Sequence, residues 1–452
     1  MWQIAEFGVA DCRVRPGETT SRRYATCVTS SDLRERFILP RLVEALDDTR
    51  IVVLQGARQV GKSTLVEQIA EQRDGVVVSL DDPGARAFAA SDPAGFVAQS
   101  PERLLVIDEA QRVPELVIAL KAAVDRDRRA GRFLVTGSAN LLDLSATHES
   151  LAGRAQSLVL HSFSQGELEG SRASFIDVVF GGDLRADHTS VLGRRDYLER
   201  ASAGGYPEAL ARSAGRRRDD WYNAYLEQIV NRDAVDVSGL RRIADLPRVL
   251  RLIAARAGSG MVWSALASDV GIPRSTLDPY VKLLETLYLI HTVPAWAAKL
   301  TAREVKQPKV FVVDTGLAAA LLGVTPDALG PTRPNSPAGG LLEGFVAGEL
   351  LRQAGWSEQR TRLGHYRDSR GAEVDIVLET PDSRVVGIEV KAAATVQSKD
   401  LSGLGTLRDR LGDRFVAGVV LYTGGRSQAV GERITAVPID ALWSVGPAPR
   451  GA

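Results

Sequence analysis

A glycine-rich stretch that begins at residue 56 constrains this chain more than any other feature. Residues 52–64 read VVLQGARQVGKST and match the pattern G-x-x-x-x-G-K-[ST] without a mismatch. The apolar run at 51–54 predicts a buried strand before the stretch, and the spacing of apolar residues in 65–70 predicts a helix after it. This order predicts a parallel α/β sheet in which the stretch is a loop between strand and helix.

The loop residues predict a nucleoside triphosphate and Mg²⁺ as ligands. Gly56 and Gly61 let the backbone curl so that successive N–H groups point at phosphates, and the start of the helix adds its positive end. We expect Lys62 to reach the β- and γ-phosphates and Ser63 to hold Mg²⁺. A glycine-rich turn without a ligand is the alternative. The expected nucleotide-binding residues are Gly56, Ala57, Arg58, Gln59, Val60, Gly61, Lys62, Ser63 and Thr64.

A second apolar run ends in two acids and indicates what happens to the triphosphate. Residues 104–107 predict a buried parallel strand, and Asp108 and Glu109 follow at its carboxyl end. We expect Asp108 to orient the Mg²⁺ shell and Glu109 to polarise a water. A fixed general base beside the γ-phosphate favours hydrolysis over transfer to a small acceptor, so the pattern predicts an ATPase. Two acids facing solvent at a strand end are the alternative.

Two later segments offer further contacts to the phosphates. A third strand, at 133–135, leads into Thr136 and Ser138, which are candidates to sense the γ-phosphate. Arg154 ends the segment LAGR and is a candidate arginine finger, in its own subunit or in a neighbour's. A surface arginine fits the sequence equally well.

Several segments together resemble a large family of bacterial and archaeal AAA-type ATPases with an uncharacterised C-terminal domain. The resemblance covers roughly residues 34–440. It implies a P-loop core of the additional-strand, catalytic-glutamate type, a winged-helix middle and a restriction-endonuclease-like end, and it implies much less about biological role. The segments that carry it are 56–63, 107–111, 136–140, 151–154, 204–208 and 231–233.

Length and composition predict an intracellular protein of several domains. The chain has 452 residues, 44% of them hydrophobic, which suffices for two or three cores. No apolar run approaches the ~18 residues that span a bilayer, and the start lacks a signal pattern, so we expect a cytoplasmic protein with no membrane partner. Cys12 and Cys27 lack metal-ligand spacing, so neither a disulfide framework nor a zinc site is indicated. The expected parts are an N-terminal tail at 1–33, the ATPase core at 34–170, a helical lid at 171–245, a winged helix-turn-helix at 246–300, a restriction-endonuclease-like α/β domain at 301–440 and a C-terminal tail at 441–452.

The lid and the charge distribution bear on a DNA partner. Basic and acidic residues both total 56, so DNA binding would require local basic patches. Arginines cluster at 216–218 and 241–242, but on helices such clusters are more often solvated faces.

Apolar residues at helical spacing in 221–230 predict core packing, and the sequence GGYP at 204–207 predicts a sharp break before them. We expect this region to convert nucleotide state into movement.

Residues 246–294 predict three short helices and a wing. Gly271 fits the bend of a helix-turn-helix, a module that contacts DNA or docks proteins. Pro279 is unfavourable inside a helix, so Asp278 is expected as N-cap and Pro279 as the first helical residue, which leaves 274–276 in the preceding turn. Asp314 follows a strand at 310–313 and precedes an apolar helix, so an N-cap role is expected.

The last region carries a second set of chemical residues. The alternation in 372–378 and 385–391 predicts two strands, and the turn residues at 380–383 predict a hairpin between them. Asp375, Glu389 and Lys391 should then lie together, and two acids with a lysine predict a Mg²⁺ site. The order of elements resembles the restriction-endonuclease core, whose pattern D…E-x-K is met by these three residues. Glu343 is then the acid on the preceding helix.

In a working nuclease the carboxylates hold the metal beside the scissile phosphate, and the lysine orients or deprotonates water. An E-x-K pattern is also common on exposed strand faces, and a fold can persist after its activity is lost. Three hypotheses therefore stay open: an ATPase that acts on or with DNA, an ATP-gated metal-dependent nuclease, and a signalling or scaffold switch whose C-terminal domain binds a protein partner. Assembly into a homo-oligomer is possible under each.

Overall fold

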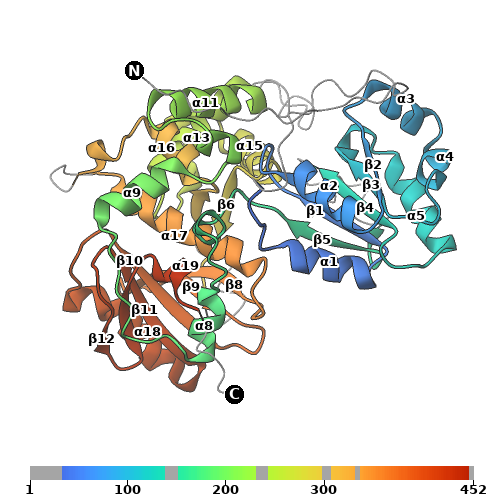
Figure 1. Ribbon diagram of the computed structural model, residues 1–452. Coiled ribbons are helices and arrows are strands. Elements are labelled where there is room, and N and C mark those ends of the chain that lie inside the picture. The colour runs from blue at the N-terminus through green and yellow to red at the C-terminus, as the bar shows by residue number, and fades with distance from the viewer. Residues whose placement is uncertain (1–32, 138–150, 231–242, 298–306, 331–335, 447–452) are drawn as a thin grey trace, which may run out of the picture. The chain divides into compact units, whose positions relative to one another are not determined.

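A five-stranded parallel sheet carries the glycine-rich loop in the computed structural model (Figure 1). Its order is β2-β3-β4-β1-β5, and every neighbouring pair is parallel. The strand after the two acids, β4, lies between β1 and β3, which is the additional strand that the sequence resemblance implied. The strands are β1 (Ile51–Gln55), β2 (Val76–Ser79), β3 (Leu105–Asp108), β4 (Phe133–Gly137) and β5 (Ala155–Val159).

The structure describes residues 33–137, 151–230, 243–297, 307–330 and 336–446. Residues 1–35 form one unit and residues 36–452 a second, and the fold below is that of the second. Cys12, Cys27 and the arginines at 241–242 lie outside the described residues.

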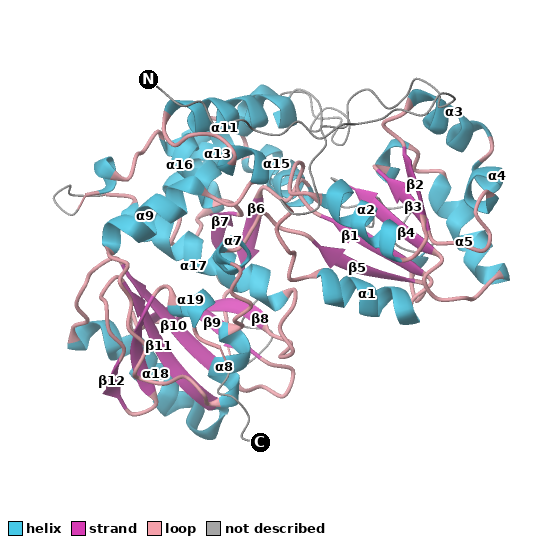
Figure 2. Cartoon of the chain, viewed as in Figure 1, coloured by secondary structure: helices cyan, strands magenta, loops and turns pink. Residues whose placement is uncertain are grey.

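Both faces of the parallel sheet are covered, as the uninterrupted apolar run of β1 requires. Val52 and Leu54 belong to one hydrophobic cluster, and Ile51 and Val53 to another, because successive side chains of a strand point to opposite faces. Helices lie on both sides of the sheet (Figure 2). They are α1 (Leu39–Asp48), α2 (Lys62–Gln72), α3 (Pro83–Ser91), α4 (Pro93–Ala98) and α5 (Leu116–Arg126).

The next part of the chain is helical, as expected. The break at 204–207 is present, because one helix ends at Ala203 and the next begins at Pro207. Trp221, Tyr222 and Tyr225 are buried, which confirms the predicted packing role of the aromatic stripe. The helices are α7 (Gln165–Glu169), α8 (Phe175–Gly181), α9 (Arg194–Ala203), α10 (Pro207–Leu210) and α11 (Arg216–Gln228).

Three helices and a strand pair follow. The helices are α13 (Leu246–Ala255), α14 (Trp263–Val270) and α15 (Arg274–Thr286), and Gly271 ends α14 with a φ of 80°. Strand β6 (Ile290–Val293) pairs antiparallel with β7 (Lys309–Val312), which leads into α16 (Thr315–Leu322).

The predicted start of α15 was wrong. The helix begins at Arg274, so Pro279 lies inside it and Asp278 is not the N-cap. Leu277 and Tyr280 are buried on either side of Pro279, and their burial, at roughly 1.5–3 kcal/mol for a large apolar side chain, offsets the lost hydrogen bond. Arg274, Ser275 and Thr276 therefore stand in the first helical turn.

The C-terminal part is built on a six-stranded mixed sheet of order β12-β13-β11-β10-β9-β8. Strands β8, β9 and β10 form an antiparallel meander, which confirms the predicted pairing of 372–378 with 385–391, and β11 then runs parallel to β10. Helices α17 and α18 pack on the sheet. The elements are α17 (Ala338–Ala354), β8 (Arg362–Arg367), β9 (Glu373–Glu379), β10 (Val385–Lys391), α18 (Ser402–Leu411), β11 (Phe415–Tyr422), β12 (Gln428–Gly431), β13 (Ile434–Pro438) and α19 (Ala441–Ser444).

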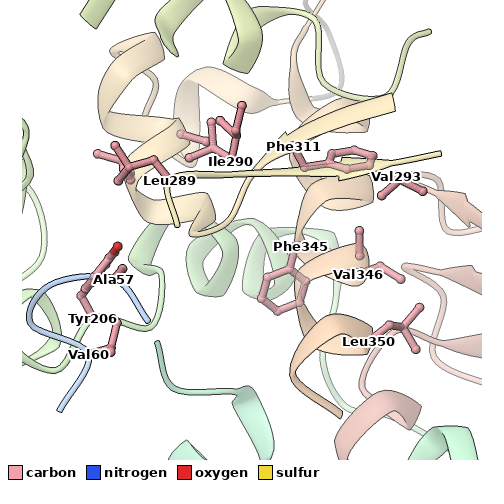
Figure 3. Close-up of a cluster of buried hydrophobic side chains, with 14 of the residues drawn as sticks. Ala57, Val60, Tyr206, Leu289, Ile290, Val293, Phe311, Phe345, Val346 and Leu350 are labelled. Carbon is pink, nitrogen blue, oxygen red and sulfur yellow. The ribbon is translucent and has the colours of Figure 1, made fainter. Parts of the chain in front are cut away.

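One hydrophobic cluster joins the glycine-rich loop to later elements (Figure 3). Ala57 and Val60 of the loop belong to the same cluster as Tyr206, Leu289 of the turn before β6, and Phe345 of α17. The loop residues thus belong to a core that also includes residues of the helical and C-terminal parts. No helix among the described residues is long and apolar enough to cross a membrane.

Candidate nucleotide site and carboxylate cluster

The glycine-rich loop lies between the end of β1 at Gln55 and the start of α2 at Lys62. Gly56 has a φ of 146°, and a Cβ there would stand 2.1 Å from the carbonyl oxygen of Leu160. Gly61 has a φ of 97° and is the N-cap of α2. Both positions require glycine, so the loop curls and the amino end of α2 faces its interior.

Lys62 places its ammonium inside this loop. The side chain is buried, and Nζ donates to the carbonyl oxygens of Gly56 at 2.8 Å and Ala57 at 2.9 Å. A cation held there is positioned to meet the phosphate oxygens of a nucleotide seated on the loop amides.

The predicted Mg²⁺ ligands lie in contact with one another. Ser63 Oγ donates to Asp108 Oδ2 at 3.1 Å, and Thr136 Oγ1 donates to Asp108 Oδ1. Ser79 Oγ reaches Asp108 Oδ2 at 3.4 Å. Hydroxyl and carboxylate oxygens are the donors that Mg²⁺ prefers, so the residues present fit the ion at this place.

Glu109 stands in a strained backbone conformation beside these residues. Its φ is 58°, in the left-handed region that non-glycine residues rarely adopt. Its N–H donates to Thr136 Oγ1 at 3.1 Å, and its carboxylate accepts from Gln111 Nε2. Thr136 therefore contacts both acids, and Gln111 orients the one expected to polarise water. Gln111 lies in segment 107–111, which carries the family resemblance, but its residue type alone indicates no role.

Two candidates are less well placed for the loop. Arg154 forms a bidentate pair with Asp125 of α5, with its Nε 2.7 Å from Oδ1 and its Nη2 3.0 Å from Oδ2. It precedes β5, whose register opposite β1 puts Arg154 at the amino edge of the sheet, about 16 Å of strand from the loop. Contact with its own loop is not made here, and a finger role in a neighbour's site stays a prediction. Ser138 lies outside the described residues.

Three residues that sequence reasoning missed hold the loop from outside. Arg36 Nη1 donates to the carbonyl oxygen of Val60 at 2.7 Å, and its Nε pairs with Glu167 at 3.0 Å. Tyr288 donates to Gln55 Oε1 at 2.9 Å, and Tyr225 donates to the Arg58 carbonyl at 3.3 Å. Burial lowers the pKa of Arg36 and Glu167 opposes the shift, so the guanidinium stays charged. No local motif marks these residues, because each acts over a long sequence separation.

Asp314 joins several elements at a buried point. Its carboxylate caps α16 by accepting from Gly316 N and Leu317 N, which confirms the predicted N-cap. It also accepts from Ser162 Oγ at 2.8 Å, Gly205 N at 2.8 Å and Tyr222 OH at 3.1 Å. Burial, with the Asp314 charge second, raises the pKa of Tyr222 well above its usual range.

The second predicted site is assembled with an unexpected member. Lys391 Nζ lies 2.7 Å from Glu389 Oε1, and Val390 N donates to Asp375 Oδ2 at 3.0 Å. Lys309 of β7 enters from outside the sheet, and its Nζ pairs with carboxylate oxygens of three residues. These are Glu343 at 2.8 Å, Asp375 at 3.0 Å and Glu373 at 3.1 Å. The four acids Glu343, Glu373, Asp375 and Glu389 are called the carboxylate cluster below.

The cluster does not fit a Mg²⁺ ion in this arrangement. Unlike the Asp108 site, where the partners of the carboxylate are neutral hydroxyls, this cluster already holds a cation, because Lys309 Nζ lies 2.8–3.1 Å from three of its acids, and Val390 N donates to the second oxygen of Asp375. Among the four acids of the cluster, all of them within the described ranges, Glu389 Oε2 alone is buried without a hydrogen-bond partner, and one oxygen cannot replace an octahedral shell. Within the described ranges, no group of three or more His, Cys, Asp or Glu side chains is arranged to hold a metal ion.

Comparison with known proteins separates the parts of the chain. Residues 48–169 match a family model described as an AAA domain, and residues 194–328 and 338–442 match two domains of unknown function, DUF8612 and DUF4143. The uncharacterized proteins Rv2008c of Mycobacterium tuberculosis (strain ATCC 25618 / H37Rv) and Mb2031c of Mycobacterium bovis (strain ATCC BAA-935 / AF2122/97) are each 26% identical over 415 residues. Each match covers 92% of this chain and 86% of the relative.

Three solved structures share lower similarity. A DNA replication initiation factor matches with a TM-score of 0.24 and 11% identity, covering 53% of this chain and 69% of that one. PCH-2 of C. elegans matches with a TM-score of 0.22 and 15% identity, covering 55% of this chain and 66% of that one. AMPPCP-bound DnaA from Aquifex aeolicus matches with a TM-score of 0.25 and 13% identity, covering 55% of this chain and 86% of that one. TM-scores this low add nothing to the argument. The AAA-domain match and the loop geometry together support an AAA-type, nucleotide-binding core in the first part of this chain, within a mixed α/β protein.

Proposed function

We propose that this protein is an ATP-hydrolysing switch whose site lies at the carboxyl ends of β1, β3 and β4. The observation that carries the proposal is the convergence of Ser63, Asp108 and Thr136 beside a loop that holds the Lys62 ammonium. Ser63 lies on α2, Asp108 on β3 and Thr136 on β4, and all three elements fall in the part of the chain that matches an AAA domain, so the arrangement is not a local accident of sequence.

The roles follow from the geometry. Lys62 would neutralise the β- and γ-phosphates, and Ser63 and Asp108 would hold Mg²⁺, which when bound offsets the charge that develops on the phosphate oxygens. Glu109 would accept a proton from the attacking water, with its carboxylate oriented by Gln111. Arg154 remains a candidate finger for a second copy of the chain.

Two substitutions separate binding from chemistry. We expect Lys62→Ala to lose ATP affinity, because it removes a contact made in the ground state. Glu109→Gln should bind ATP normally and hydrolyse it roughly 10²–10⁴-fold more slowly, because it removes only the general base. Binding of a fluorescent ATP analogue and release of phosphate measure the two effects. Equal loss of binding in both variants would show that the roles are misassigned.

Action on DNA is the second candidate function. The observation in its favour is that Arg274, Ser275 and Thr276 are in the first turn of α15, the part of a helix-turn-helix that contacts base edges. The surface is not strongly basic, since Arg274 pairs with Asp278. ATP turnover with and without single-stranded, duplex and branched DNA tests the idea. Stimulation that Arg274→Ala abolishes and Arg185→Ala leaves intact would support DNA binding, and no stimulation by any DNA would exclude it.

The nuclease hypothesis receives less support. What supports it is the antiparallel meander of β8, β9 and β10, the parallel strand after α18, and the contact of Lys391 with Glu389. The ion that cleavage requires is not accommodated, so we infer that this part serves as a binding or scaffold element of the switch. A protein partner for it remains part of the proposal.

A further inference from the structure

We propose that the ammonium of Lys309 is the built-in cation of the carboxylate cluster and takes the place of a divalent metal there. Through this lysine, the cluster binds the β6–β7 strand pair. The inference concerns the C-terminal part and does not depend on ATP hydrolysis. It explains why a site with the acids of a nuclease pattern leaves no room for the ion.

The geometry around Nζ is that of an occupied cation site. Three carboxylate oxygens, from Glu343 on α17 and from Glu373 and Asp375 on β9, surround the ammonium at 2.8–3.1 Å. Lys309 is fully buried, with 0% of its surface exposed. A lysine is rarely buried unless it is paired, and here two of the paired acids, Glu343 and Asp375, are ones that the sequence pattern assigned to a metal.

Hydrogen bonds and strand pairing hold the backbone at Lys309 and at the two residues before it. Pro308 accepts a hydrogen bond from Met261 N at 2.7 Å, and the carbonyl oxygen of Gln307 lies 2.9 Å from His365 Nε2 of β8. Lys309 itself begins β7, where it pairs with Val293 of β6. The side chain is therefore part of a rigid element and not a surface lysine that reached the acids by chance.

Charge compensation supports the same assignment. Burial lowers the pKa of Lys309, but Glu343 and Asp375 outweigh burial and raise it above the ordinary value, so the ammonium persists at neutral pH. Burial, with the Asp375 charge second, raises the pKa of Glu343. Without Lys309, the buried acids would repel one another, and the cluster would need another cation or bound protons.

The strand pair that Lys309 secures also reaches the nucleotide site. Tyr288, two residues before β6, donates to Gln55 at the entrance of the glycine-rich loop. Val313 N, at the end of β7, bonds to the carbonyl oxygen of Leu289 at 3.0 Å. One end of this element thus contacts the loop, and the other end is fixed in the carboxylate cluster by a lysine.

Binding of Mn²⁺ to the full chain without nucleotide tests the proposal, with free Mn²⁺ measured by electron paramagnetic resonance. Wild type and Asp375→Asn should both lack a site in the cluster. Lys309→Met, which keeps the length of the side chain and removes its charge, should gain a Mn²⁺ site that is lost again in the Lys309→Met/Asp375→Asn double variant. Lys391→Met is the matched control, because Lys391 contacts Glu389 and Asp400 and leaves Lys309 in place. It should gain no site.

Two results would overturn the proposal. One is an Asp375-dependent Mn²⁺ site in the wild type, since the metal would then displace the lysine. The other is a folded Lys309→Met protein that gains no such site. If Lys309→Met does not fold, the comparison of wild type with Asp375→Asn decides alone: equal absence of binding supports the built-in cation, and binding in wild type only rejects it.

Discussion

Arg36 illustrates how a single residue outside any motif can support the nucleotide loop. Its guanidinium contacts the Val60 carbonyl and pairs with Glu167, and both side chains are buried. Arg36→Ala should destabilise the protein by roughly 3–5 kcal/mol, because it leaves Glu167 as a buried, unpaired charge. Urea unfolding followed by fluorescence measures the change. Arg216→Ala is the control, since its pair with Asp220 is largely exposed and should contribute at most about 1 kcal/mol.

The protein should lose stability in acid, because two histidines, His161 and His291, have lowered pKa values in the folded state. Burial lowers the pKa of His161 to about 3 and that of His291 to about 4, whereas an unfolded histidine titrates near 6.5. As the pH falls, the unfolded state therefore takes up protons before the folded state does. The contribution of the neutral histidines to the free energy of unfolding is complete above pH 6.5 and is lost as the pH falls toward 4. At pH 5 the loss should be roughly 1–2 kcal/mol per histidine.

The comparison that isolates this effect is between wild type and a His161→Gln/His291→Gln variant. Urea unfolding at pH 7 and pH 5 should show a smaller drop in the variant, since acids that titrate in the same range are common to both proteins. An equal drop would show that neither histidine resists protonation in the folded state.

The roles of residues in local patterns could be predicted from the sequence. The contacts that side chains from distant segments make with them could not. The loop glycines, Lys62 and Ser63 follow from spacing along one strand–loop–helix unit, Asp108 follows from its place at the end of a second apolar strand, and the structure brings Ser63 and Asp108 together. Lys309 lies 34 residues from Glu343 and 66 from Asp375, so its entry into the carboxylate cluster depends on tertiary packing that no local pattern encodes. The contact between Glu389 and Lys391 agrees with the sequence pattern, whereas the contacts of Lys309 with these acids had no sequence signal.

At the level of elements, α15 shows where propensity is overridden. Because proline is unfavourable inside a helix, the sequence predicts that this helix begins at Pro279. The apolar stripe of Leu277, Tyr280 and Leu284 instead extends the helix back to Arg274. The other elements around it, including the glycine that ends α14, agree with sequence periodicity. Burial of a whole face thus decided the boundary against one lost hydrogen bond.

Pro279→Ala tests that balance. Pro279 is exposed and cannot donate the bond that an interior helical residue makes, so alanine should stabilise the protein by roughly 1–3 kcal/mol. Thermal unfolding measures the shift. A lower melting temperature for Pro279→Ala would show that the helix requires the local distortion that proline imposes.

At the scale of the whole molecule, the parts are joined by buried polar groups as well as by apolar packing. Asp314 accepts bonds from the segment after β5, from the break before α10, from α11 and from its own helix. The sequence predicted its capping role and not these other partners, because they come from positions 92–152 residues away. Asp314 thus connects the end of the five-stranded parallel sheet to the part that leads into the carboxylate cluster.

Asp314→Asn should therefore destabilise the molecule beyond the loss of a helix cap. One carboxylate oxygen becomes an amide that donates, and it faces groups that are themselves donors, so the cost should be roughly 2–4 kcal/mol. Asp327→Asn is the control, because that side chain is 75% exposed and should change stability by less than about 0.5 kcal/mol.

Hydrogen exchange distinguishes a joint between parts from a simple cap. If Asp314 connects the parts, the amides of Gly205 and Gly316 should both exchange faster in Asp314→Asn, since both donate to the same carboxylate from different elements. Faster exchange at Gly316 alone would restrict the residue to capping α16. Acceleration at both sites, with the glycine-rich loop still able to bind ATP, would show that the sheet and the later elements are held together at this buried carboxylate.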